Sequence, residues 1–310
     1  MTVPPALAPR TPGAPSDIKA RQDQPPHFTR LLAYSHAYDA AQRWRVARMF
    51  GTLLLAAVAP FIAYFAKDAS DGLGALAAGW LVVGRAIMLR FEHAHTARAV
   101  AIQELYDTEL FGLSWNASLC GHKPSEVDIA AYARKKAGDA DRYLDWYSID
   151  LSTAVWPGDV VLCQRQSSAW SRRDQDGYAA VLIGLAAAWF VVGVVFALLN
   201  SLELGQYLIR LFLPCAPAFL DAVELAGEHR SSATGRGALE REINQQWDEY
   251  CDDGSTLTGA KCRENQDASY LSRSSCPRVP QWFYWLRRAT SDAATRDGTV
   301  PLLAAKEGQR

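Results

Sequence analysis

The sequence contains few cysteines, and none of them has the spacing that a metal or disulfide module needs. Six cysteines are spread over 310 residues, with no C-x-x-C pair. This spacing argues against a compact zinc module and against a secreted disulfide framework. We therefore expect reduced thiols that mostly serve packing at Cys120, Cys163, Cys215, Cys251, Cys262 and Cys276.

The chain also has no large excess of positive or of negative charge. The chain has 32 Lys and Arg residues against 33 Asp and Glu residues, so its net charge is close to zero. No overall field draws such a protein toward nucleic acid, and we expect no DNA partner. Electrostatic recognition has to come from local clusters of charge.

The usual catalytic and cofactor motifs are also absent. The sequence has no P-loop, no G-x-G-x-x-G after a strand and no G-x-S-x-G elbow. The "FEHAH" stretch is a poor metal site, because His93 and His95 at i, i+2 point to different sides of a helix. We expect no enzyme, no catalytic residues, no metal and no cofactor. An alternative is a membrane-anchored enzyme that uses His93, Glu104 and Asp107.

The N-terminus lacks the basic and then apolar segments of a signal peptide. Residues 1–26 are rich in proline, which predicts a disordered leader. A cytoplasmic helix is expected to follow over residues 27–48. Strand-like alternation of useful length is also missing, so the aqueous parts are predicted to be mostly helical.

Long apolar stretches dominate what is present. Four of them have close to the length that a helix needs to cross a bilayer, and the one that begins at Gly177 is the most apolar. The fourth is marginal, because it contains Arg210 and two prolines. A large soluble helical protein is the alternative, but it predicts polar faces that only the fourth stretch resembles. The stretches are residues 49–66, 72–89, 177–201 and 204–220.

The four stretches predict an all-α membrane protein with two transmembrane helical hairpins. Basic residues flank the hairpins, while the two short turns hold only Lys67, so both termini should be cytoplasmic in a multi-pass inner-membrane protein. The predicted parts are the first hairpin over 49–90, a cytoplasmic helical insertion over 91–176, the second hairpin over 177–221, a C-terminal cytoplasmic helical region over 222–298 and a tail over 299–310.

Helical periodicity recurs in the aqueous parts. An apolar face is predicted to prolong the second membrane helix through Phe91, Ala94, Ala97, Ala101, Leu105 and Tyr106. Ser125 and Asp128 have capping-box spacing at the start of a short helix. Another face, formed by Leu239, Ile243 and Trp247, has the spacing that docks on a second helix.

Two arginines fall inside the predicted spans. Arg85 lies near a cytoplasmic end, where its side chain can reach the interface, or it can line an internal path. Arg210 lies deeper, which favours a role in lining a pore or in pairing within a homo-oligomer; reaching the outer interface is the alternative.

A second basic and aromatic cluster occurs near the C-terminus. It can anchor the chain at the membrane interface, or it can pack against other cytoplasmic helices. The cluster consists of Trp282, Phe283, Trp285, Arg287 and Arg288.

The densest charge cluster directly precedes the third apolar stretch. One interpretation is that its arginines fix topology and anchor the interface. The other is an anionic ligand site, because guanidinium groups bind phosphate bidentately and a base stacks on an indole ring. The candidate nucleotide-binding residues are Gln164, Arg165, Trp170, Arg172 and Arg173.

Four stretches lie around the predicted hairpins, namely "RQDQPPHFTRLLAYSHAYDAAQRWR", "LYDTELFGLSWN", "DWYSIDLSTAVWPGDVVLCQRQSSAWSRRDQDGYA" and "NQDASYLSRSSCPRVPQWFYWLRR". Their more specific parts are F-G-L-x-W-N, C-Q-R followed by a Trp and an Arg pair, and Q-D with V-P-x-W-F-Y. In order and spacing, over most of residues 20–288, they resemble the SMODS-associating four-transmembrane effector family; Ser167 stands where this family is expected to have Asn.

The resemblance implies a membrane effector of bacterial cyclic-oligonucleotide antiphage defence. A cognate nucleotidyltransferase would make the messenger, and the effector would oligomerise and breach the inner membrane, which arrests or kills the cell. The alternatives are a constitutive ion channel or transporter, and the membrane-anchored enzyme named above. The resemblance implies no catalytic residues.

Overall fold

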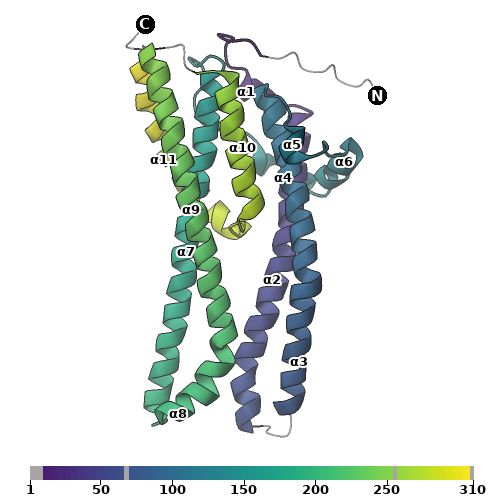
Figure 1. Ribbon diagram of the computed structural model, residues 1–310, viewed down its shortest axis with the longest axis vertical. Helices are drawn as coiled ribbons and strands as arrows, with labels where there is room; N and C mark the ends of the chain where they lie inside the picture. Colours follow the sequence, from purple (N-terminus) through teal and green to yellow (C-terminus); the bar gives the residue numbers. More distant parts are fainter. Residues whose placement is uncertain (1–9, 66–69, 254–256, 308–310) are drawn as a thin grey trace. The chain divides into compact units, whose positions relative to one another are not determined.

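The computed structural model describes residues 10–65, 70–253 and 257–307. Within these ranges the chain is built of helices (Figure 1). Pro15 and Val155 form an isolated antiparallel bridge. The all-α prediction is therefore confirmed for the described part of the chain. The six cysteines form no disulfide in the described part of the chain, as expected.

The chain divides into two compact units. Unit 1 takes its described residues from Met1–Asp39, Thr96–Gln175 and Ser232–Arg310, and unit 2 takes its residues from Ala40–His95 and Asp176–Ser231. The helices that contribute residues to both units are α2 (His27–Phe65), α4 (Leu89–Phe111), α7 (Gly158–Leu199) and α9 (Leu213–Asp253).

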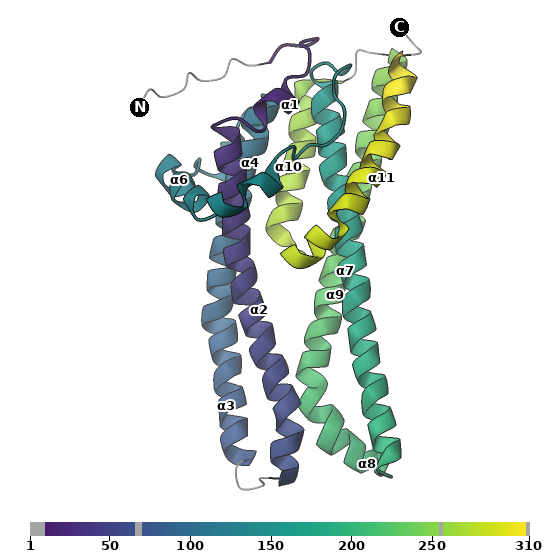
Figure 2. The same ribbon diagram turned by 180° about the vertical axis from the view of Figure 1, so that it is seen from behind.

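Unit 2 contains the helices of the two predicted hairpins. Both views show α2 beside α3 (Ser70–Val83) and α7 beside α9 (Figures 1 and 2). The turn that includes Lys67 lies outside the described residues. Short elements join α7 to α9, namely α8 (Leu204–Tyr207) and the π-helical η4 (Leu208–Phe212).

The surface of unit 2 is rich in exposed apolar side chains. On α7, Trp189, Val192 and Leu199 are 55%, 62% and 80% exposed. Among the described residues, α7 is the one helix long and apolar enough to cross a bilayer, and 17% of its most apolar window is buried. A core helix of a soluble protein would bury most of that window. The exposed apolar surface of α7 suits a lipid environment.

The α2 and α3 helices approach closely at Gly51. A Cβ atom there would lie 1.9 Å from Cζ2 of Trp80. We expect Gly51→Ala to lower the free energy of unfolding by about 1–3 kcal/mol, because overpacking forces side chains or backbone to shift. Thermal unfolding in detergent measures this change. Gly79→Ala is the control, since a Cβ there meets nothing within 4 Å; equal melting temperatures for the two variants would contradict the close packing.

The second apolar stretch continues into the insertion, as predicted. The α3 helix passes through the π-helical η2 (Gly84–Met88) into α4. The predicted face of α4 is wrong in its first half, however, because Phe91, Ala94 and Ala97 are exposed while Glu92 is 2% exposed. Glu92 is buried because Arg45 of α2 donates to it from Nε at 2.6 Å, a pairing that apolar periodicity does not reveal.

Unit 1 is built around one hydrophobic core. Tyr106 of α4, Cys163 of α7 and Trp247 of α9 belong to it and are at most 1% exposed. The predicted face of Leu239, Ile243 and Trp247 is confirmed: Ile243 and Trp247 are buried, and Leu239 packs against the same core. The helices α10 (Gly259–Ser275) and α11 (Gln281–Glu307) complete the unit.

The predicted leader over residues 1–26 and the predicted tail over residues 299–310 both include residues that are packed against the rest of unit 1. Residues 10–26 are packed into unit 1 and are not a disordered leader: Arg10 bonds the buried Asp159 at 2.5 Å, and Ile18 in α1 (Ile18–Arg21) is fully buried. The predicted tail 299–310 continues α11 to Glu307, and Thr299 is 3% exposed. The buried Asp159 needs a cation, and the proline content of the leader did not indicate that Arg10 supplies it.

The short helices of the insertion are α5 (Ala117–Cys120), α6 (Glu126–Arg134) and the 3₁₀ turn η3 (Ala137–Tyr143). Ser125 precedes α6 as predicted, but its side chain forms no capping hydrogen bond. The sequence therefore predicted the start of this helix correctly, but the capping hydrogen bond expected from Ser125 is not formed.

His27, at the start of α2, makes the stability of unit 1 depend on pH. Its ring is 2% exposed, and burial, followed by Arg21 and Arg30, lowers its pKa from 6.5 to about 4, while Asp17 acts in the opposite direction. Between pH 6.5 and 4 the unfolded chain therefore binds a proton that the folded chain excludes. We expect acidification across this window to destabilise the protein by about 2–3 kcal/mol through this group.

Denaturant unfolding at several pH values measures the effect. Replacing His27 with Gln should flatten the acid limb of the stability profile, whereas replacing the exposed His122 should leave the limb unchanged. An acid limb of the same slope in the His27 variant would assign the pH dependence to other groups.

Candidate functional site

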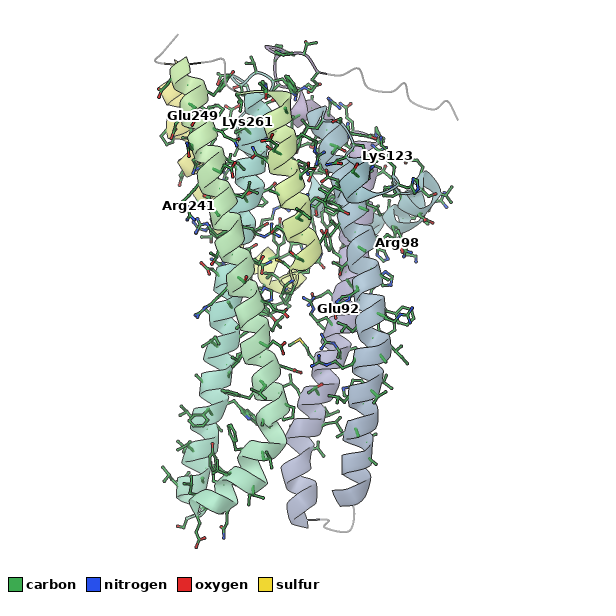
Figure 3. All side chains as sticks on the ribbon, in the orientation of Figure 1. Glu92, Arg98, Lys123, Arg241, Glu249 and Lys261 are labelled. Atoms are coloured by element: carbon green, nitrogen blue, oxygen red, sulfur yellow. The ribbon has the colours of Figure 1, made fainter. Side chains whose placement is uncertain are left out.

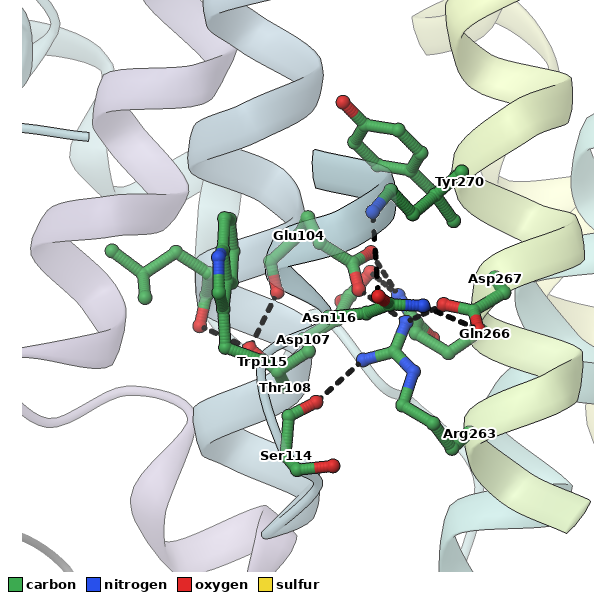
Figure 4. Close-up of polar contacts among 12 residues, drawn as sticks. Glu104, Asp107, Thr108, Ser114, Trp115, Asn116, Arg263, Gln266, Asp267 and Tyr270 are labelled. Carbon is green, nitrogen blue, oxygen red and sulfur yellow. Dashed lines mark hydrogen bonds and ion pairs between the residues drawn. The ribbon is translucent and has the colours of Figure 1, made fainter. Parts of the chain in front are cut away.

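Buried carboxylates of α4 connect to α10 in unit 1 (Figure 4). Glu104 accepts from Arg263 at 2.5 Å and from Gln266 at 2.8 Å, and it is fully buried. Asp107 accepts from Arg273 at 2.6 Å. Burial raises the pKa of Glu104, and Arg263 opposes that effect. These carboxylates, which the enzyme alternative requires, are thus engaged in internal ion pairs.

A cavity of about 140 Å³ lies in unit 1 next to this network. We call it the arginine cavity, because three guanidinium groups line it against one carboxylate, that of Asp174. The arginines come from different elements: Arg236 from α9, Arg273 from α10, and Arg278 from the segment between α10 and α11. Their convergence makes the cavity electropositive.

Arg236 is the unusual member of the cavity. It is 8% exposed, and among the described residues no carboxylate lies within 4.0 Å of it. Its Nε donates a long hydrogen bond, of 3.4 Å, to Oγ of Ser232. Burial and then the neighbouring Arg273 lower its pKa to about 10. A buried guanidinium without a counter-charge is costly, so it marks a place where an anion is favourable.

Aromatic rings form much of the cavity wall. Trp146, from the segment before α7, lies with its ring centroid 6.1 Å from Tyr284 of α11 in a stacked arrangement. Trp170 of α7 meets the same two rings edge-on. Arg278 lies over the ring of Tyr38, 3.9 Å from its centroid. Guanidinium groups beside aromatic rings are the groups that bind phosphates and nucleobases.

Asp174 is the carboxylate of the cavity. It is 6% exposed, and its Oδ1 is buried without a hydrogen-bond partner among the described residues. Burial raises its pKa to about 6, although Arg287 and Arg173 pull it down. Near neutral pH Asp174 is therefore mostly ionised, and its single charge neutralises the arginines of the cavity only partly.

Comparison with known proteins identifies the family. The profile of the SMODS-associating 4TM effector domain matches residues 16–301. The chain belongs to this family. A probable CBASS effector molecule from Bacillus cereus strain VD146 is 23% identical over 279 residues, which are 88% of this chain and 93% of the relative. No solved structure matches the chain.

Membership in the 4TM effector family confirms the resemblance drawn from the four sequence stretches. The family, together with the exposed apolar surface of α7, indicates association with a membrane. In Figure 3 the side chains drawn on the α8 end of α7 and α9 are mostly carbon, whereas charged groups such as Lys261, Arg241 and Glu249 are carried by unit 1.

The five candidate nucleotide-binding residues do not share one site, because they point to different sides of α7. Trp170 lines the arginine cavity. Gln164 donates to the backbone oxygen of Cys262, and Arg165 donates to Oδ1 of Asn244 at 2.6 Å. Arg172 pairs with Glu240 at 2.7 Å, and the backbone oxygen of Arg173 accepts from Arg287.

The C-terminal basic and aromatic cluster makes several contacts within unit 1. Phe283 is 5% exposed, and Trp285 meets Tyr143 edge-on. Arg288 donates to the backbone oxygen of Arg142, while Trp282 remains 61% exposed. Of this cluster, Trp282 therefore keeps the exposed surface that an interfacial anchor needs.

The structure describes the side chain of only one of the two arginines predicted to lie inside the spans. Arg85 lies in η2 and lines a cavity of unit 2. Arg210 lies in the π-helical turn η4, and its side chain is outside the described part of the structure.

Sequence reasoning missed the three arginines of the cavity. Arg236 comes from a polar, glycine-interrupted stretch, and Arg273 and Arg278 flank "SSCP". Each is an isolated basic residue, so no local density of charge marks it. Ser167, which stands where the family is expected to have Asn, also lines the cavity, and that expected difference is the signal that could have directed attention there.

Proposed function

We propose that this chain is a membrane effector of a cyclic-oligonucleotide antiphage defence system. Its membership in the 4TM effector family and its similarity to a probable CBASS effector molecule support this function. The messenger, made by a cognate nucleotidyltransferase, binds unit 1, and the helices of unit 2 respond by opening or disrupting the inner membrane. Growth arrest or death of the infected cell follows.

The observation that carries the proposal is the unpaired, buried Arg236 in a cavity walled by aromatic rings. A phosphodiester supplies the missing negative charge, and a base or ribose lies against the rings. A volume of about 140 Å³ is below the roughly 300–1,000 Å³ typical of small-molecule pockets. Part of the messenger therefore enters the cavity, and the remainder lies outside it.

The orientation follows from the basic residues at the ends of the apolar stretches. Both termini and the insertion lie in the cytoplasm, where the messenger is produced. Opening requires that the messenger bind the open arrangement more tightly; a shift from 1:99 to 99:1 takes about 5.5 kcal/mol. Contacts shared among the subunits of a homo-oligomer, with Arg210 pairing across subunits or lining the pore, can provide this difference.

Dye release from liposomes that contain the purified full-length protein tests the proposal. A panel of cyclic dinucleotides and cyclic trinucleotides is added to separate samples. We expect one or a few of them to release the dye, with little release in their absence. Release without any nucleotide would indicate a constitutive channel, and no release with any of them, in a protein shown to be inserted, would reject the pore.

A further inference from the structure

A second cavity, of about 410 Å³, lies entirely within unit 2. Three segments line it: α2 near Arg48, the junction of α3 and η2 near Arg85, and α9 from Leu213 to Glu224. In the sequence, each segment lies where an apolar stretch meets charged residues. The predicted topology places all three at the cytoplasmic face of the membrane, the depth of phospholipid headgroups.

The charges of this cavity are balanced but mostly unpaired. It is lined by Arg48 and Arg85 and by Asp221 and Glu224. Among the described residues, neither carboxylate has an ion-pair partner within 4.0 Å, and Arg85 has none either. Arg48 reaches Glu92 at 3.4 Å, a carboxylate that Arg45 already neutralises.

Unsatisfied donors provide an independent observation. Nε of Arg48 and Nε1 of Trp80 are buried and have no hydrogen-bond partner among the described residues. Both residues line the cavity. Buried donors without a partner are rare in proteins, and a bound water, ion or ligand group is one explanation for them. Apolar side chains, including Leu81, Leu213 and Leu220, line the rest.

We propose that this cavity binds the headgroup of a zwitterionic phospholipid with a primary amine, phosphatidylethanolamine. The phosphodiester accepts hydrogen bonds from the guanidinium groups of Arg48 and Arg85, and the ammonium group donates to Asp221 and Glu224. The leucines contact the glycerol and the first acyl carbons. An anionic lipid leaves the carboxylates unmatched, and a choline headgroup has no N–H to donate to them.

Native mass spectrometry of the detergent-purified full-length protein tests the proposal. Palmitoyl-oleoyl phosphatidylethanolamine, phosphatidylglycerol and phosphatidylcholine are titrated separately. We expect phosphatidylethanolamine to bind about tenfold more tightly than the other two, the range of one charge-assisted contact. Arg85→Ala should weaken the binding of all three lipids, because each of them carries the phosphodiester, whereas replacing Arg90, which is exposed and does not line the cavity, should leave their binding unchanged.

The carboxylates give a second, opposite test that does not depend on Arg85. In the double variant Asp221→Asn and Glu224→Gln, the cavity keeps two positive charges and should prefer phosphatidylglycerol. Equal binding of the three lipids by the unmodified protein, a preference for phosphatidylglycerol, or an unchanged preference in the double variant would overturn the proposal. The lipid proposal rests on one part of the proposed function, namely that the chain is inserted in a membrane. A chain outside the bilayer would bind none of the three lipids, whereas failure of the lipid proposal alone would appear as equal binding of all three.

Discussion

Replacing Arg236 with Met is expected to abolish messenger-induced killing while leaving the free protein at least as stable as the parent. Met keeps most of the side-chain volume but removes a buried charge that has no carboxylate within 4.0 Å in the described part of the chain. Removal of an uncompensated buried charge is neutral or stabilising by about 1–2 kcal/mol. A contact with a phosphate that contributes about 2–5 kcal/mol corresponds to a loss of affinity of about 30-fold to more than 1,000-fold.

Two measurements separate these effects. Thermal unfolding without nucleotide reports stability, and plasmid-borne killing together with nucleotide titration of the purified protein reports recognition. Arg241→Met is the matched control, since this arginine lies on the same helix and is exposed (Figure 3). Wild-type killing by the Arg236 variant would remove the arginine cavity from the mechanism. A large loss of stability would show that Arg236 is structural.

The sequence predicted the parts of this fold that depend on long runs and simple periods. The helices of the hairpins and the docking face with Ile243 and Trp247 follow from apolar residues at regular spacing. The arginine cavity depends instead on residues from α9, α10 and the segment before α11. Arg236 and Arg273, for example, are more than 35 positions apart in the sequence. No local pattern specifies such a convergence.

The charge cluster before the third apolar stretch shows, conversely, that residues close in the sequence do not always share one site. Arg165 and Arg172 are close in sequence to Trp170, but a helix turns them toward α9, where Asn244 and Glu240 engage them. Density of charge along the chain therefore did not measure density in space. The burial of Arg236 and the pairing of Glu104 could be seen only once the helices were packed.

Replacing Arg263 with Met is expected to destabilise the protein by about 3–5 kcal/mol, because it leaves the fully buried Glu104 without its cation. Arg263 also donates to Asp267 and to the backbone oxygen of Ser114, so its loss disturbs the junction of α4, α5 and α10. Denaturant unfolding followed by near-ultraviolet circular dichroism measures the change. Glu264→Gln, at an exposed position of the same helix, should change stability by less than about 0.5 kcal/mol.

A second substitution distinguishes the charge from the loss of packing. Adding Glu104→Gln to the Arg263 variant removes the isolated carboxylate, and Gln266 can still donate to the side-chain oxygen. The double variant should therefore be more stable than Arg263→Met alone by about 2 kcal/mol or more. If the double variant is less stable than either single variant, Glu104 contributes through its hydrogen bonds and not through its charge. Because burial raises the pKa of Glu104, the single variant should also regain stability as the pH falls toward this pKa and the carboxylate takes up a proton.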